Sequence, residues 1–287
     1  MQTRRRLTLA LVATALVAVL EFWGGAVSRS LALTSDAVHV CMDTFALGLA
    51  LLAAIGAARP ADPRRTFGYG RIEVLGALAN GTLLLVATIA IVYAALRRFA
   101  MPIEPHAALM TLVATAGLAV NAGVGLLLRT ESRRDLNVRA ALFHVFGDAL
   151  GAVAVIAGGI AIAFTHRAWI DPLLSLFVAA IIVVGVARVM RDAAEVLLES
   201  VPSDVDSTSL AKHLQEISGV TGVHDLHVWS IGSGSHALSA HVLLDDRRLS
   251  EATDVLREIT TCAQTHFGIT HVTIQFECET CPIVVQH

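Results

Sequence analysis

One stretch of this chain decides its fold: residues 35–57, which read SDAVHVCMDTFALGLALLAAIGA. The second half of the stretch is apolar, while the first half carries Asp36, His39 and Asp43. A helix needs about 20 mostly apolar residues to cross a bilayer. The stretch is long enough, so we expect a membrane-spanning helix that carries ionisable side chains.

Five other stretches have the same length and apolar character. The six predicted spans are residues 7–32, 35–57, 74–96, 107–128, 138–165 and 169–190. The chain of 287 residues is 55% hydrophobic and 16% charged, whereas soluble proteins carry about 25% charged residues. Open loops cannot cross lipid, because their backbone groups would stay unsatisfied. We therefore predict a multi-pass α-helical membrane protein with a transmembrane domain over residues 1–191.

The remaining residues, 192–287, are richer in Asp, Glu and His and read as a soluble domain. Their patterns predict a helix at 207–217, strands at 222–231 and 236–245, a helix at 249–266 and a strand at 270–277. Gly232-Ser233-Gly234 is the expected turn between the first two strands. The order αββαβ predicts a small ferredoxin-like α+β domain, with helices packed on one face of a sheet.

The distribution of arginine predicts the orientation in the membrane. Most arginines lie in four segments, at 4–6, 59–71, 129–139 and 188–191, which share one side if the spans alternate. The other side holds Arg29, Arg97, Arg98 and Arg167. Positive residues favour the cytoplasmic side, so both termini and the polar domain are expected there. The net charge of −3 gives no reason to expect a nucleic-acid partner.

Two spans carry matching polar motifs, His39-Val-Cys-Met-Asp43 and His144-Val-Phe-Gly-Asp148. Residues four apart share a helical face. Two such faces would supply two imidazole nitrogens and two carboxylate oxygens, a tetrahedral set that suits Zn²⁺. The alternative is two His–Asp hydrogen-bonded pairs that hold helices together. The repetition of the motif within lipid, where charge is expensive, favours a metal site.

These ligands also titrate. A metal requires neutral His and ionised Asp, so its binding releases protons. Histidine is poised to exchange protons near neutral pH. The chemistry therefore allows metal to be exchanged for protons.

Other polar residues in or beside the spans have two open interpretations. Glu21, Asn80 and Asn121 either line a transport pathway or form interhelical hydrogen bonds. Phe67, Arg71 and Glu73 lie before the third span, and they either link the membrane helices to the polar domain through ion pairs or reflect ordinary charge beside the membrane.

The polar domain offers further metal-binding side chains. Strand alternation sends His224 and His227 to opposite faces, and likewise His236 and His241, so they cannot all share one site. Cys278-Glu-Thr-Cys281 is a single C-x-x-C pair. Two thiolates at that spacing can chelate zinc, and with Glu277 and a nearby His they would complete a site.

The chain resembles the cation diffusion facilitator family, especially its zinc-transporting branch, from about residue 7 to 280. The resemblance is carried by Ser30-Leu-Ala-Leu, Asp36-Ala-Val-His39 through Asp43, Phe67-Gly-Tyr-Gly-Arg71-Ile-Glu73, Asp135-Leu-Asn-Val-Arg139, His144 through Asp148, Trp169-Ile-Asp-Pro172, His224-Asp-Leu-His-Val-Trp229 and His271-Val-Thr-Ile-Gln-Phe-Glu277.

The resemblance implies a homodimer that exports metal from the cytoplasm by alternating access, driven by inward proton flow. It implies that the transported ion is held by His39, Asp43, His144 and Asp148. A His at the first position is typical of zinc selection in this family, and an Asp there of broader or manganese-type selectivity. The resemblance also favours a regulatory metal site in the polar domain at His224, His241, His271 and Glu277.

We therefore expect a Zn²⁺/H⁺ antiporter in a cell membrane, in a bacterium the inner membrane, and not an enzyme. One rival is an intramembrane metalloenzyme, which would need an open coordination position and a separate acid or base. No H-E-x-x-H motif is present. The other rival is a metal-sensing receptor, which would not need His and Asp in two spans.

Overall fold

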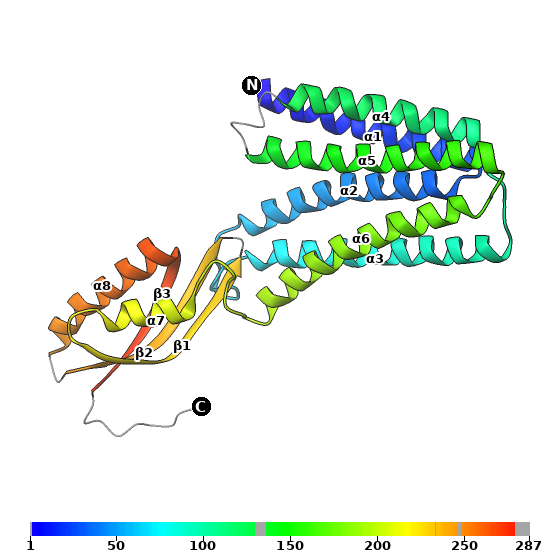
Figure 1. Cartoon of the computed structure of the whole chain (residues 1–287). Helices are drawn as coiled ribbons and strands as arrows, with labels where there is room; N and C mark the ends of the chain where they lie inside the picture. Colours follow the sequence, from blue (N-terminus) through cyan, green and yellow to red (C-terminus); the bar gives the residue numbers. More distant parts are fainter. Residues whose placement is uncertain (1, 130–135, 233, 246–247, 279–287) are drawn as a thin grey trace. The chain divides into compact units, whose positions relative to one another are not determined.

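The computed structural model describes residues 2–129, 136–232, 234–245 and 248–278 (Figure 1). Within this part of the chain, six helices are long and apolar enough to cross a membrane. They are α1 (Gln2–Ser28), α2 (Leu31–Ala57), α3 (Arg71–Ala100), α4 (Ala107–Arg129), α5 (Leu136–Thr165) and α6 (Ile170–Leu197). The prediction of six spans is confirmed.

The boundaries differ from the predicted ones by a few residues. The first predicted span ran on to residue 32, but α1 ends at Ser28 and α2 begins at Leu31. Arg29 between them has a φ of 56°, a left-handed conformation that interrupts a helix. The break is short, with only Ser28-Arg29-Ser30 as a polar interruption, so the apolar content of a whole span does not fix its exact position.

The contacts divide the chain into two compact units, each described by itself. The first consists of residues 1–49 and 79–189. Within it, α4 packs against α1 and α5, as Figure 1 shows. Its buried apolar residues include Leu33, Met110 and Ile162.

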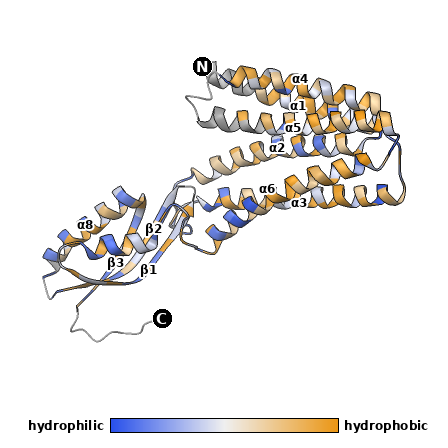
Figure 2. Cartoon of the chain, viewed as in Figure 1, coloured by the Kyte–Doolittle hydropathy of each residue, from blue (hydrophilic) through white to orange (hydrophobic). Residues whose placement is uncertain are grey.

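The membrane helices consist mostly of hydrophobic residues (Figure 2), and many large apolar side chains are exposed. Phe22, Leu51, Ile89 and Phe164 are all exposed. Such continuous apolar exposure would be unfavourable in water, and it suits a surface that meets lipid.

The second unit consists of residues 50–78 and 190–287. It contains α7 (Ser207–Gln215), β1 (Val220–Gly232), β2 (Ser235–Leu244), α8 (Leu249–Phe267) and β3 (Ile269–Cys278). The predicted order αββαβ is confirmed. The sheet order is β1-β2-β3, with β1 antiparallel and β3 parallel to the central β2.

The local sequence explains the ends of these elements. The Asp206 side chain accepts hydrogen bonds from the backbone N–H groups of Thr208 and Ser209 and so caps α7. Gly268, with a φ of 65°, ends α8 in a left-handed conformation. Leu210, Leu238 and Ile259 belong to the core between the two helices and the sheet.

Candidate metal sites

The first motif lies in α2 as predicted. The Nε2 atom of His39 is 3.5 Å from Oδ2 of Asp43, so the two side chains share a helical face. Both are half-buried, and Nδ1 of His39 is buried without a hydrogen-bond partner among the described residues. Cys41, two residues after His39, is exposed.

The second motif lies in α5. Asp148 is buried, with 6% of its surface exposed. The side chain of His144 lies outside the part that the structure describes. Convergence of all four ligands therefore stays a prediction.

A contact between α2 and α5 bears on this prediction. A Cβ added to Gly151 of α5 would lie 3.1 Å from Oδ1 of Asp36 of α2. Gly151 is three residues from Asp148, and Asp36 is three residues from His39, so each contact residue shares a helical face with a motif residue. The contact favours the two motif faces turning toward each other.

Another buried carboxylate lies in α1. Glu21 is 1% exposed, and a Cβ added to Gly117 of α4 would lie 2.6 Å from its Oε1 atom. Its Oε2 atom and the Oδ1 atoms of Asn80 and Asn121 are buried without a hydrogen-bond partner among the described residues. Oxygen atoms without a partner do not support the interpretation that these three residues form interhelical hydrogen bonds. The interpretation that they line a transport pathway stays a prediction.

A second site lies in the sheet. Nε2 of His224 is 3.1 Å from Oε2 of Glu277, and Nδ1 of His241 is 2.9 Å from Oε1 of the same carboxylate. His224 and His241 are cross-strand neighbours in β1 and β2, and their ring centroids are 5.1 Å apart. One donor atom from each of the three residues lies within 4.8 Å of the others. Two nitrogens and one oxygen are a typical zinc donor set that leaves one position open.

Asp225 lies beside this cluster, although it was not among the predicted ligands. A bulge interrupts the β1–β2 register between His224 and His227, and Asp225 adopts a φ of 49° there. Its Oδ2 atom is thereby placed 3.7 Å from Nε2 of His241, while Oδ1 accepts a hydrogen bond of 2.9 Å from His227. The His-Asp-Leu-His sequence is the only local signal for it, since a bulge depends on how strands pair.

Electrostatics keeps both carboxylates ionised. The pKa of Asp225 is lowered, chiefly by the hydrogen bond from His227. Burial raises the pKa of Glu277, but the hydrogen bonds from His224 and Gln275 and the charges of the two histidines outweigh it, so the net shift is downward. Metal ligation requires the ionised form, and both groups are ready for it.

The other predicted ligands of this domain do not join the cluster. His271 is exposed, pairs with Ala237 near the other end of β3 and lies with its ring 5.8 Å from that of Phe67. Glu277 lies six positions further along the extended strand, which corresponds to a distance of roughly 20 Å. Cys278 is half-buried next to Glu277, and Cys281 lies outside the described residues. A metal-binding role of the C-x-x-C pair stays a prediction.

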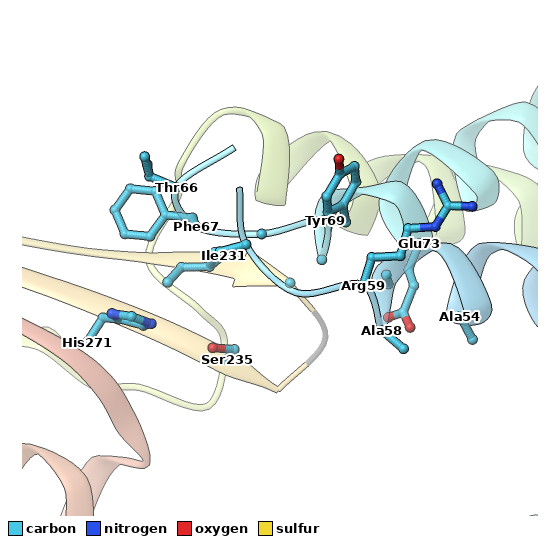
Figure 3. A pocket seen from close by; sticks show the side chains of 15 residues that line it. Ala54, Ala58, Arg59, Thr66, Phe67, Tyr69, Glu73, Ile231, Ser235 and His271 are labelled. Atoms are coloured by element: carbon cyan, nitrogen blue, oxygen red, sulfur yellow. The ribbon is translucent and has the colours of Figure 1, made fainter. Parts of the chain in front are cut away.

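Instead, His271 lines a cavity of about 480 Å³ in the second unit (Figure 3). Arg59, Tyr69 and Glu73 line the same cavity from the segment between α2 and α3 and from the start of α3. Beside it, Arg71 forms an ion pair of 2.8 Å with Glu199, which follows α6. This contact supports the ion-pair interpretation for Arg71.

Comparison with known proteins identifies the family. The family model for the cation efflux transmembrane domain matches residues 7–198, and that for the cation efflux protein cytoplasmic domain matches residues 202–279. The predicted domain boundary between 191 and 192 lies close to the gap between these matches, but its position stays a prediction.

Several relatives match over almost the whole chain. The metal cation efflux system protein CzcD of Cupriavidus metallidurans is 40% identical over 277 residues, 96% of this chain and 87% of that protein. The cadmium, cobalt and zinc/H⁺-K⁺ antiporter of Bacillus subtilis is 38% identical over 264 residues, 91% of this chain and 85% of that protein. The zinc transporter ZitB of Escherichia coli is 37% identical over 279 residues, 96% of this chain and 88% of that protein.

A solved structure also matches. The metal-bound C-terminal domain of the CzcD transporter is 41% identical, with a TM-score of 0.24, and the match covers 25% of this chain and 99% of that one. The two family models together span nearly the whole chain, and the fold has the six membrane helices and αββαβ domain expected from the resemblance. The chain therefore belongs to the cation diffusion facilitator family of cation efflux transporters.

Proposed function

We propose that this protein exports Zn²⁺ from the cytoplasm in exchange for protons, with His39, Asp43, His144 and Asp148 as the transport site. The observation that carries the proposal is the half-buried His39–Asp43 pair in α2, with Asp148 buried in α5. Charges within a membrane span are costly and are kept for function. The names of the relatives, which include zinc and antiporter, support the choice of ion and mechanism.

The exchange follows from the ligand chemistry. The site binds metal when both imidazoles are neutral and both aspartates are ionised. When it opens to the outside, protons that bind these groups displace the metal. Protons released to the cytoplasm by the next metal ion complete the cycle, so inward proton flow drives outward metal flow.

Assembly and placement complete the proposal. The chain acts as a homodimer in the cell membrane, the inner membrane in a bacterium, with both termini and the αββαβ domain in the cytoplasm. The arginine distribution supports this orientation. A metal at His224, His241 and Glu277 would then report the cytoplasmic metal concentration. Their donor atoms, within 4.8 Å of one another, support such a site.

Two alternative functions, an intramembrane metalloenzyme and a metal-sensing receptor, are less well supported, for separate reasons. Family membership gives no support to a metalloenzyme, since the matched family model describes cation efflux. A receptor would use its membrane helices only as an anchor and would keep its function when Asp148 loses its charge.

The test is Zn²⁺ transport by the purified protein in proteoliposomes with an imposed pH gradient. Wild type is expected to move Zn²⁺ and protons in opposite directions, and Asp148→Asn to lose at least 90% of the rate. Glu104→Gln is the matched control, because Glu104 is an exposed acid paired with His166 outside the motifs. Proton-independent transport, or full transport by Asp148→Asn, would refute the proposed mechanism.

A further inference from the structure

The helical layer of the polar domain holds a second cluster of metal-binding side chains, away from the sheet site. His213 of α7 and His266 of α8 lie with their ring centroids 5.8 Å apart, at an interplanar angle of 53°. Two imidazoles bound to one tetrahedral ion, with metal–nitrogen distances of about 2.0–2.1 Å, place their centroids roughly 5 Å apart. The pair is therefore near the spacing that a shared metal requires, as the 5.1 Å pair in the sheet is.

His213 is held in the right tautomer for ligation. Its Nδ1 atom lies 2.8 Å from the backbone oxygen of Ser209. A carbonyl oxygen can only accept, so Nδ1 donates the hydrogen and Nε2 carries the lone pair. Metal-binding histidines are commonly oriented by this kind of hydrogen bond to a carbonyl.

Helical spacing adds two donors to the histidines. Cys262 lies four residues before His266 on α8, so the two share a face. Glu216 is the C-cap of α7, three residues after His213, and its helical φ and ψ continue the face of that ring. Cys262 also packs against the core cluster that contains Leu214 of α7. Cys262 and His213 are half-buried, and Glu216 and His266 are exposed.

We propose that α7 and α8 bind a transition-metal ion through His213, His266 and Cys262, with Glu216 or water as the fourth ligand. One thiolate and two imidazoles suit Zn²⁺ or Co²⁺ better than Mg²⁺ or Ca²⁺. Among the described residues, only the sheet cluster already has its donors within 4.8 Å. The donor atoms of the helical site would come within bonding distance of one ion after rotation of the side chains. His266 and Glu216 are exposed, so their side chains have room to rotate.

The bound ion would fasten α7 to α8. The competing explanation is that the rings simply pack together, because His213 also contacts Phe267 edge-on at 5.5 Å. Ring packing needs no thiol, so the role of Cys262 separates the two explanations.

The experiment is a Co²⁺ titration of the full chain in detergent, followed by the absorption band of a cobalt–thiolate bond. The band is expected in wild type and in Glu277→Gln, which disables the sheet site. Cys41→Ser and the double variant Cys278→Ser/Cys281→Ser should also keep it. In the Cys278→Ser/Cys281→Ser background, Cys262→Ser should abolish the band, and His213→Gln or His266→Gln should weaken Co²⁺ binding at least tenfold.

Two outcomes would overturn the proposal: a wild-type chain without the band, or a band that survives when Cys262→Ser is added to Cys278→Ser/Cys281→Ser. Thermal unfolding without metal checks that Cys262→Ser folds like wild type. Metal should then raise the midpoint of wild type by stabilising the folded state, and raise that of Cys262→Ser less. The result is independent of transport, since none of these residues belongs to the proposed transport site.

Discussion

Asp171, the second residue of α6, accepts a 2.8 Å hydrogen bond from Arg98 near the end of α3, although its side chain is fully buried. The same carboxylate accepts hydrogen bonds from Ser30 Oγ and from the backbone N–H groups of Leu31 and Ala32. The carboxylate thus accepts hydrogen bonds from backbone N–H groups in the first turn of α2, which have no partner within their own helix. One buried charge joins three helices at one end of the first unit.

We predict that Asp171→Asn destabilises the protein by about 3 kcal/mol, because Arg98 loses its ionic partner in a buried place. The measurement is thermal or denaturant unfolding in detergent. The exposed Glu104–His166 pair is the control, and Glu104→Gln should cost less than about 1 kcal/mol. Equal stability of the two variants would mean that the buried pair does not hold the helices together.

Selectivity should depend on His39. The variant His39→Asp replaces an imidazole with a carboxylate, and oxygen ligands favour Mn²⁺ relative to Zn²⁺. The ratio of Zn²⁺ to Mn²⁺ transport in proteoliposomes should fall at least tenfold. Cys41→Ala, next to the site in sequence but exposed, should leave the ratio unchanged. If both variants keep the wild-type ratio, His39 does not select the ion.

The sheet site should depend on Glu277. In Glu277→Gln, the side chain keeps its size but loses the charge that both His224 and His241 contact. Zn²⁺ binding to this site should weaken at least tenfold, measured by calorimetry on the Cys262→Ser background. His271→Gln is the matched control, since His271 lies at the other end of β3. Weakening by His271→Gln instead would place the site elsewhere.

Binding at the sheet site should fall as the pH is lowered. Imidazoles titrate near pH 6.5, and their protonated forms cannot bind metal. The lowered pKa of Glu277 keeps its carboxylate ionised below its ordinary range, so the carboxylate does not account for the loss of binding. Affinity should then drop by up to about a hundredfold per pH unit below about pH 6, with two protons bound per metal released. A tenfold change in affinity per pH unit, which corresponds to one proton per metal ion, would show that a single histidine ligates the metal.

Two glycines in the second unit should tolerate no side chain. A Cβ on Gly232, at the end of β1, would lie 2.9 Å from Cα of Gly70, just before α3. Gly232→Ala forces two backbones apart and should cost about 1–3 kcal/mol of stability. Gly185→Ala, where nothing lies within 4 Å, is the control. Full stability of Gly232→Ala in thermal unfolding would show that this contact is not tight.

Much of the fold could be predicted from the sequence, since it rests on short-range patterns. Span length and apolar content located six helices, and alternation located the strands of the αββαβ domain. The exact break at Arg29 was missed because the apolar content of a whole span does not locate a single left-handed residue. Asp225 was missed because the bulge that turns its side chain toward His241 arises from strand pairing.

The sequence by itself determined that His39 and Asp43 share a face, and likewise His144 and Asp148, because the helical repeat sets the direction of each side chain. It also determined the membrane character of six segments. Only the tertiary structure decided which histidines of the polar domain meet. His224, His241 and Glu277 come from three strands, and the pairing register brings them together while leaving His271 apart. Partners such as Asp171 and Arg98, 73 residues apart, are joined by packing between helices, which no local pattern encodes.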